Sequence, residues 1–138
     1  MRAIALTRTT LIPALFAVLV GCATVSAHDD ASTDAVVDGA DFTMQPGAQV
    51  ALADGSNLRY LRVLEDSRCK PDVQCIWAGD AEVAFQWTPS AGSPQDFSLH
   101  TGKAPRDHVL GDRLLTLLSL TRGPAPSATL RVGVAPAP

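Results

Sequence analysis

The chain has few aromatic residues, few cysteines, no excess of positive charge and no very long apolar run. Of its 138 residues, 5% are aromatic, three are cysteine, and the formal net charge is −3. This length fits one domain and excludes a multi-domain enzyme. The acidic balance argues against nucleic-acid binding, which needs basic patches. No apolar run reaches the roughly 20 residues that a membrane-spanning helix requires, and no internal repeat is visible.

The N-terminus has the organisation of an export signal. Arg2 and Arg8 provide positive charge, no acidic residue occurs before Asp29, and residues 11–20 are uncharged and mainly apolar. This pattern predicts that residues 1–21 are a signal peptide removed from the mature protein. Removal takes both arginines, so the mature net charge becomes 9 − 14 = −5.

The segment that ends the apolar run, Leu19-Val20-Gly21-Cys22, resembles the lipobox of bacterial lipoproteins. The resemblance implies diacylglycerol on the Cys22 thiol and a fatty acyl group, such as palmitate, on the new N-terminus. Several acyl chains anchor a protein durably to a bilayer. In Gram-negative cells, Ala23 in place of an aspartate favours the outer membrane, with the domain facing the periplasm. The alternative is an ordinary secretory signal cleaved after Ala23 or Ala27.

The composition after Cys22 predicts a flexible acidic tether over residues 22–41. Five aspartates repel one another there and keep the chain extended. His28 lies in this segment and is not interpreted as a metal ligand, since a flexible tether preorganises no site. The folded domain is expected over residues 42–134, followed by a disordered tail over residues 135–138.

Alternating apolar residues predict an all-β domain. Ala81–Thr88 is the clearest strand, and others are expected around residues 50–52, 58–65, 97–99 and 130–134. In the strand at 58–65, the expectation is that Leu58, Tyr60 and Leu64 share one face and that Leu61 and Val63 lie on the other. Six or seven short strands separated by turns imply a single antiparallel β-sandwich or small barrel.

The segment Arg113–Thr121 is ambiguous, because Leu114, Leu117 and Leu118 also suit a helix face. Its length between turn signals favours a strand with a bulge, and a short helix is the alternative.

The most specific segment lies around the two remaining cysteines. With Cys22 lipidated, Cys69 and Cys75 form a pair in an oxidising compartment, which predicts a disulfide. Trp77 is expected to lie over the disulfide or to close the end of the core, and exposure as a binding anchor is the alternative. Gly79 permits a backbone conformation that other residues resist.

This segment resembles a motif in small, largely uncharacterised bacterial exported proteins and lipoproteins. The matching positions are Asp66, Ser67, Arg68, Cys69, Cys75, Trp77 and Gly79. Lys70 stands where proline is usual, and Arg122-Gly123 departs from the family pattern before Pro124. The resemblance implies an exported lipoprotein and brings no activity with it.

No catalytic or metal-binding constellation is evident. Ser67 lacks a recognisable base or oxyanion hole, and no nucleophile elbow or phosphate-binding glycine loop occurs. Cys69 and Cys75 with His100 and His108 do not have the spacing of a zinc site. Asp80 and Glu82 on one strand face lack an assignable acidic partner.

The sequence therefore predicts a non-enzymatic binding or structural module of the cell envelope, held by lipid on Cys22 and needing no cofactor or metal. Its candidate binding surface comprises Arg68, Lys70, Trp77 and Asp80, with an envelope protein or small molecule as the expected partner. The alternatives are a small periplasmic hydrolase using His100 or His108, and an inhibitor-like domain that presents the disulfide loop to an envelope enzyme.

Overall fold

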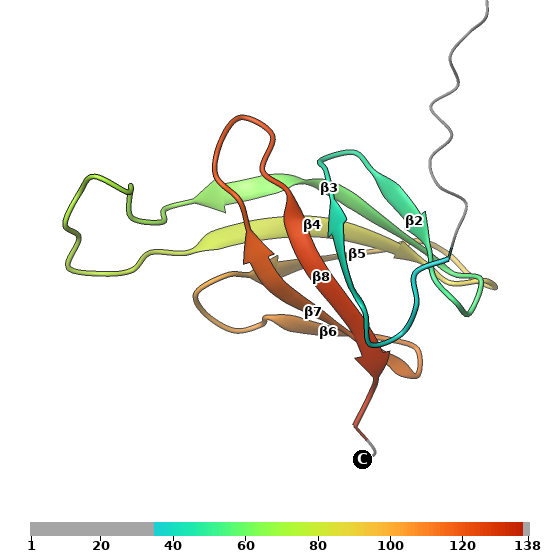
Figure 1. Cartoon of the computed structure of the whole chain (residues 1–138). Coiled ribbons are helices and arrows are strands. Elements are labelled where there is room, and N and C mark those ends of the chain that lie inside the picture. Colours follow the sequence, from blue (N-terminus) through green and yellow to red (C-terminus); the bar gives the residue numbers. More distant parts are fainter. Residues whose placement is uncertain (1–34, 137–138) are drawn as a thin grey trace, which may run out of the picture.

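The computed structural model describes residues 35–136 and shows two antiparallel sheets of four strands each, packed as a β-sandwich (Figure 1). This confirms the predicted all-β class. The strands are β1 (Asp41–Met44), β2 (Gln49–Ala51), β3 (Asn57–Asp66), β4 (Ala81–Thr88), β5 (Gln95–His100), β6 (Asp107–Leu110), β7 (Arg113–Leu120) and β8 (Ala128–Val134).

Most strands are joined as antiparallel hairpins, and the first and last strands of the domain lie side by side. One sheet has the order β2-β3-β4-β5 and the other has the order β1-β8-β7-β6. Within the sheets each strand pairs with a sequence neighbour, except that β1 pairs with β8. The connections therefore gather at the two ends of the sandwich.

The core lies between the sheets, and β4 shows how the sequence builds it. Ala81, Val83, Phe85 and Trp87 point inward and are at most 8% exposed, as their alternation predicts. The ring of Phe85 contacts the rings of Tyr60 and Phe97, with centroid distances of 5.4 and 5.7 Å. Three of the seven aromatic residues of the chain thus pack together in the core.

The predicted faces of β3 are partly wrong because the strand contains two irregularities. Its register against β4 shifts between Tyr60 and Arg62 and again between Val63 and Glu65. Each shift inserts one residue and reverses the alternation that follows. Val63 consequently packs against the core, whereas Leu64 is 47% exposed.

The ambiguous leucine-rich segment is strand β7. Leu115, Leu117 and Leu120 are buried in the core, and a register shift lies between Leu117 and Ser119. The predicted strand with a bulge is confirmed. The additional strands are β1 and β6, which have four residues each and are too short to show a clear alternation.

The folded domain begins earlier than predicted. Val36 forms a parallel bridge with Leu52. Asp38 pairs with Arg113 at 2.8 Å, and Asp41 pairs with Arg131 at 2.6 Å. Residues 35–41 therefore belong to the domain rather than to the tether, because arginines of β7 and β8 neutralise aspartates that were expected to repel one another.

The predictions for the signal peptide, for Cys22 and for the tether up to residue 34 lie outside the described residues. Within residues 35–136 the structure contains no helix long and apolar enough to span a membrane. The predicted tail is described only at its start, where the Ala135 N–H donates to the Asp112 carbonyl at 3.0 Å.

Candidate functional site

The segment between β3 and β4, residues 67–80, forms a loop that projects past the end of both sheets (Figure 1). We call it the disulfide loop. Its two arms continue the hairpin pairing, since the Ser67 N–H donates to the Asp80 carbonyl at 2.7 Å and the Cys69 N–H donates to the Ala78 carbonyl at 3.1 Å. The base of the loop is therefore held as firmly as a short hairpin.

Gly79 allows the two arms to approach each other. Its φ of +72° lies in the left-handed region, and a Cβ at this position would collide with the backbone of Ser67 and Arg68. No other residue fits both conditions without displacing the opposite arm. The predicted need for glycine here is confirmed.

The predicted disulfide between Cys69 and Cys75 is confirmed. The sulfur atoms are bonded and the two Cα atoms lie 5.9 Å apart. The bond closes the outer part of the loop, which no strand supports. It limits the conformations that residues 70–74 and the adjacent Ile76 can adopt.

Two arginines fasten the disulfide loop to the opposite sheet. The Arg68 guanidinium pairs with Asp66 at 2.5 Å and donates to the carbonyls of Leu120 and Thr121 at 2.5 and 3.0 Å. Arg122, which follows β7, donates to the Cys69 carbonyl at 2.5 Å. These bonds connect the two sheets at the loop end of the sandwich.

Arg68 is therefore not part of an available binding surface. Its side chain is 11% exposed, and its donors are directed toward Asp66 and main-chain carbonyls. The hydrogen bond from Arg68 holds the pKa of Asp66 below its usual value of 3.8. The sequence placed Arg68 on the candidate binding surface, but its bonds to the distant carbonyls of Leu120 and Thr121 hold the side chain against the opposite sheet.

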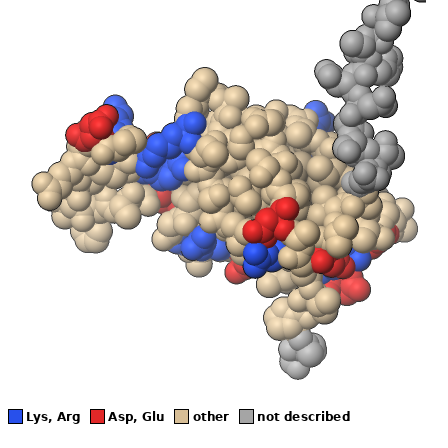
Figure 2. All heavy atoms as spheres, viewed as in Figure 1, with Lys and Arg blue, Asp and Glu red and all other residues tan. Residues whose placement is uncertain are grey.

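The outer end of the disulfide loop presents apolar side chains to solvent. Val73, Ile76 and Trp77, which we call the loop tip, are 53%, 93% and 82% exposed. The expectation that Trp77 covers the disulfide or closes the core is wrong, because the loop extends past the body and no opposite sheet faces this residue. Figure 2 shows the projecting loop as mostly uncharged surface with adjoining basic and acidic groups at its end. Lys70 and Asp72 are the charged residues between Cys69 and Cys75.

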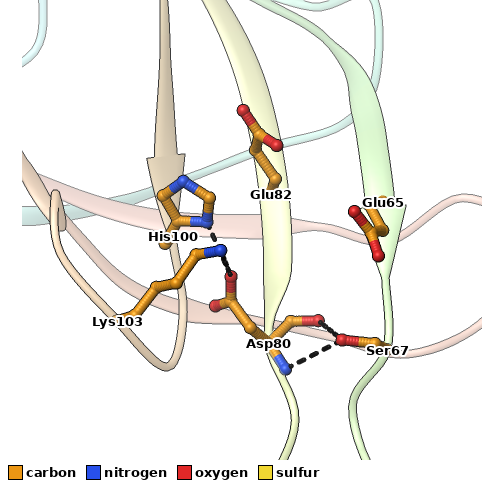
Figure 3. A pocket seen from close by; sticks show the side chains of 6 residues that line it. All are labelled: Glu65, Ser67, Asp80, Glu82, His100 and Lys103. Carbon is orange, nitrogen blue, oxygen red and sulfur yellow. Dashed lines mark hydrogen bonds and ion pairs between the residues drawn. The ribbon is translucent and has the colours of Figure 1, made fainter.

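A second, polar feature lies at the base of the loop on the outer face of the first sheet. It is a hollow of about 40 Å³, lined by Glu65, Ser67, Asp80, Glu82, His100 and Lys103 (Figure 3). A hollow of this size accommodates about one water molecule. We call it the polar hollow.

Asp80 is the centre of the polar hollow. One carboxylate oxygen lies 2.6 Å from His100 Nδ1, and the other accepts a hydrogen bond from the Gly102 N–H at 2.7 Å. Burial alone would raise the pKa of Asp80, but the bonds from Gly102 and His100, together with Lys103, hold the pKa below 3.8. Asp80 is therefore an ionised anchor for the β5–β6 connection and not a free group on the rim of a binding surface.

The geometry of the polar hollow does not assemble a nucleophile with a base. The Ser67 hydroxyl donates to the main-chain carbonyl of Asp80 at 3.0 Å, rather than to His100. Glu82 accepts a hydrogen bond from the Ser98 hydroxyl at 2.6 Å. The hydrogen bonds of Ser67 and Glu82 hold the end of the sheet together.

The two histidines of the domain lie in different environments. His108 stacks on Phe97 with a centroid distance of 3.9 Å, and burial lowers its pKa below 6.5. His100 belongs to the polar hollow. In the part of the chain that the structure describes, no group of three or more His, Cys, Asp or Glu side chains is arranged to hold a metal ion.

The candidate surface predicted from the sequence is thus divided. Trp77 and Lys70 are exposed on the disulfide loop, whereas Arg68 and Asp80 stabilise its base. The pairing of Asp80 with His100 was not predicted, although Asp80 directly precedes β4 and His100 is the last residue of β5. No protein-family model, curated protein or solved structure matches the chain.

Proposed function

We propose that this protein is a small lipoprotein of the cell envelope that acts as a binding module. In this proposal lipid on Cys22 holds the domain at a membrane, and the loop tip makes the functional contact. The sequence from Leu19 to Cys22 supports the anchor, and the geometry of the disulfide loop supports the contact.

The observation that carries the proposal is the exposure of Ile76 and Trp77 on a constrained loop. Exposed aromatic residues are frequent anchors of binding surfaces, and most surface positions are polar. The disulfide, Gly79 and the two arginines restrict the loop before it meets a partner. A preorganised loop loses less conformational entropy on binding than a flexible one does.

A binding role also agrees better with the polar hollow than hydrolysis does. Its volume of about 40 Å³ corresponds to about one water molecule. The hydroxyl of Ser67 donates to a main-chain carbonyl of the loop base. These contacts favour a supporting role for the hollow.

Photo-crosslinking in intact cells tests the contact. A photoreactive phenylalanine analogue replaces Trp77 in one variant and Val134 in the control, because both native residues are 82% exposed. We expect a specific adduct, to protein or to lipid, from position 77 and not from position 134. Adding Ile76→Asp should remove the adduct, and equal yields from both positions would contradict a contact through the loop tip.

The anchor requires its own measurement. Mass spectrometry of the mature N-terminus should show an acylated Cys22, and Cys22→Ala should release the protein from the membrane fraction. An unmodified N-terminus beginning after Ala23 or Ala27 would show that the chain is secreted without lipid.

A further inference from the structure

The shape and size of the loop tip restrict the kind of partner that it fits. The tip is a projection with three large apolar side chains, Val73, Ile76 and Trp77. A standard protein–protein interface uses about 20–30 residues on each side. The tip is far smaller than that, and the polar hollow and the arginine contacts lie behind it. A fluid partner, which does not have to match the shape of the tip, fits such a small projection better than the surface of a folded protein does.

The side chains of the tip are those that enter the boundary region of a bilayer. Tryptophan is enriched where acyl chains meet lipid headgroups, and isoleucine and valine partition into the apolar side of that boundary. Lys70 is on the same loop and is exposed, so its ammonium group can remain among the headgroups while its stem lies along the apolar region.

The position of the proposed anchor permits the same protein to touch the bilayer twice. The described chain begins at the opposite end of the body from the disulfide loop (Figure 1). From Cys22 to Ala35 the chain spans at most about 45 Å when fully extended. Strand β3, with 10 residues, is about 33 Å long. The disulfide loop adds to that length, so the chain outside the structure reaches the membrane from the far end when the domain is tilted toward the surface.

We propose that the partner of the loop tip is a phospholipid bilayer, into which Ile76 and Trp77 insert at the boundary between headgroups and acyl chains. The inference rests on the proposed function, since it names the partner of the same tip. The lipid on Cys22 and the loop tip then act as two membrane contacts, and the second contact fixes how the domain is oriented on the surface.

Depth-dependent fluorescence quenching tests this inference on the mature chain recovered from membranes. The protein is reconstituted into vesicles of phosphatidylethanolamine and phosphatidylglycerol whose acyl chains carry bromine either near the carbonyl or near the methyl end. The difference between the wild type and Trp77→Phe isolates the signal of Trp77 from that of the buried Trp87. We expect bromine near the carbonyl to quench Trp77 more strongly than bromine near the methyl end.

A matched control places the same reporter elsewhere. In the variant Trp77→Phe/Val134→Trp the indole stands at a position of equal exposure away from the loop, and we expect bromolipids to leave it unquenched. Ile76→Asp should abolish the quenching of Trp77. Thermal melts of all variants should match the wild type, because the changed side chains are exposed.

The outcomes separate this inference from the proposed function. If bromolipids leave Trp77 unquenched and an aqueous quencher reaches it as readily as it reaches the tryptophan at position 134, the bilayer is not the partner. A crosslink from position 77 to a protein, together with that result, would overturn the bilayer inference and retain the proposed function. Absence of any crosslink with the same result would overturn both.

Discussion

Two tryptophans of one hairpin have opposite environments. Trp77 in the disulfide loop is 82% exposed, whereas Trp87 on β4 is 8% exposed. Trp87 lies opposite Leu58 of β3 and Gln95 of β5, so neighbouring strands hold it on the inward face. Trp77 lies beyond the last strand pair and has no sheet facing it. The difference shows that the reach of the opposite sheet, rather than the residue type, decides which aromatic side chain packs and which is presented.

The boundary between the two environments is formed by the arginine contacts. Arg68 in the loop donates to the carbonyls of Leu120 and Thr121, and Arg122 after β7 donates to the carbonyl of Cys69 in the loop. These hydrogen bonds cover the end of the core between the two sheets with polar groups, so Trp77 does not have to cover it. The hairpin is thus divided into a packed part, which is strands β3 and β4, and a presented part, which is the disulfide loop.

The largest expected effect is the loss of the packed tryptophan. Trp87→Ala should lower the free energy of unfolding by about 3–5 kcal/mol, because it leaves a cavity in the core. Chemical denaturation measures the loss. Trp87→Phe is the control and should cost less, since it keeps an aromatic ring and removes an indole N–H that has no hydrogen-bond partner among the described residues. Equal losses for both variants would contradict a packing role.

The second effect concerns the disulfide, which lies in the presented part. The double variant Cys69→Ser/Cys75→Ser should lower the free energy of unfolding by about 2 kcal/mol, since a short closed loop restricts the unfolded chain. Asp72→Asn, inside the same loop, is the control and should change stability by less than about 0.5 kcal/mol. A loss for the double variant no larger than that of the control would show that the loop base alone holds the structure.

In the packed part, the residues that face the core could be predicted from the sequence wherever apolar and polar residues alternate regularly along a strand. Ala81–Thr88 alternates without interruption, and its inward residues are those of the core. Alternation could not reveal the irregularities of β3, because an inserted residue changes the face of Val63 and Leu64 without changing the composition. Residues 35–41 were misassigned for a related reason, since the arginines that neutralise Asp38 and Asp41 are far away in the chain.

In the presented part, features could be predicted from the sequence where they depend only on residues close together in the chain. The Cys69–Cys75 pair and the requirement for Gly79 follow from nearby residues. The role of Arg68 depends on carbonyl groups at the end of β7, and the pairing of Asp80 with His100 depends on the register between β4 and β5. Such contacts between distant segments have no signature in one sequence.

The third effect is a pH dependence of the boundary. Because Arg68 lowers the pKa of Asp66 in the folded protein, the stabilisation from this pair is present above 3.8 and is lost as the pH falls through the lower folded-state pKa. Asp66→Asn should cost about 1 kcal/mol at pH 7, since the carboxylate is 35% exposed and solvent screens the pair. The difference between variant and wild type should shrink below pH 3.8.

A double-mutant cycle with Arg68→Met assigns that effect to the pair. The coupling between the two substitutions should be favourable at pH 7 and smaller at the acidic end of the titration. A coupling that does not change with pH would assign the stability of the loop base to the bonds between Arg68 and the main-chain carbonyls.

The smallest expected effect on stability is that of the presented tryptophan. Trp77→Ala should change the free energy of unfolding by less than about 0.5 kcal/mol, because the side chain is 82% exposed and has little packing to lose. In combination with Cys69→Ser/Cys75→Ser, its effect should add to that of the disulfide, since Trp77 does not cover the bond and the two share no buried environment. Thermal and denaturant unfolding of the three variants measures this. A loss of several kcal/mol, or marked non-additivity, would mean that Trp77 packs on the loop in solution and is not available to a bilayer or any other partner.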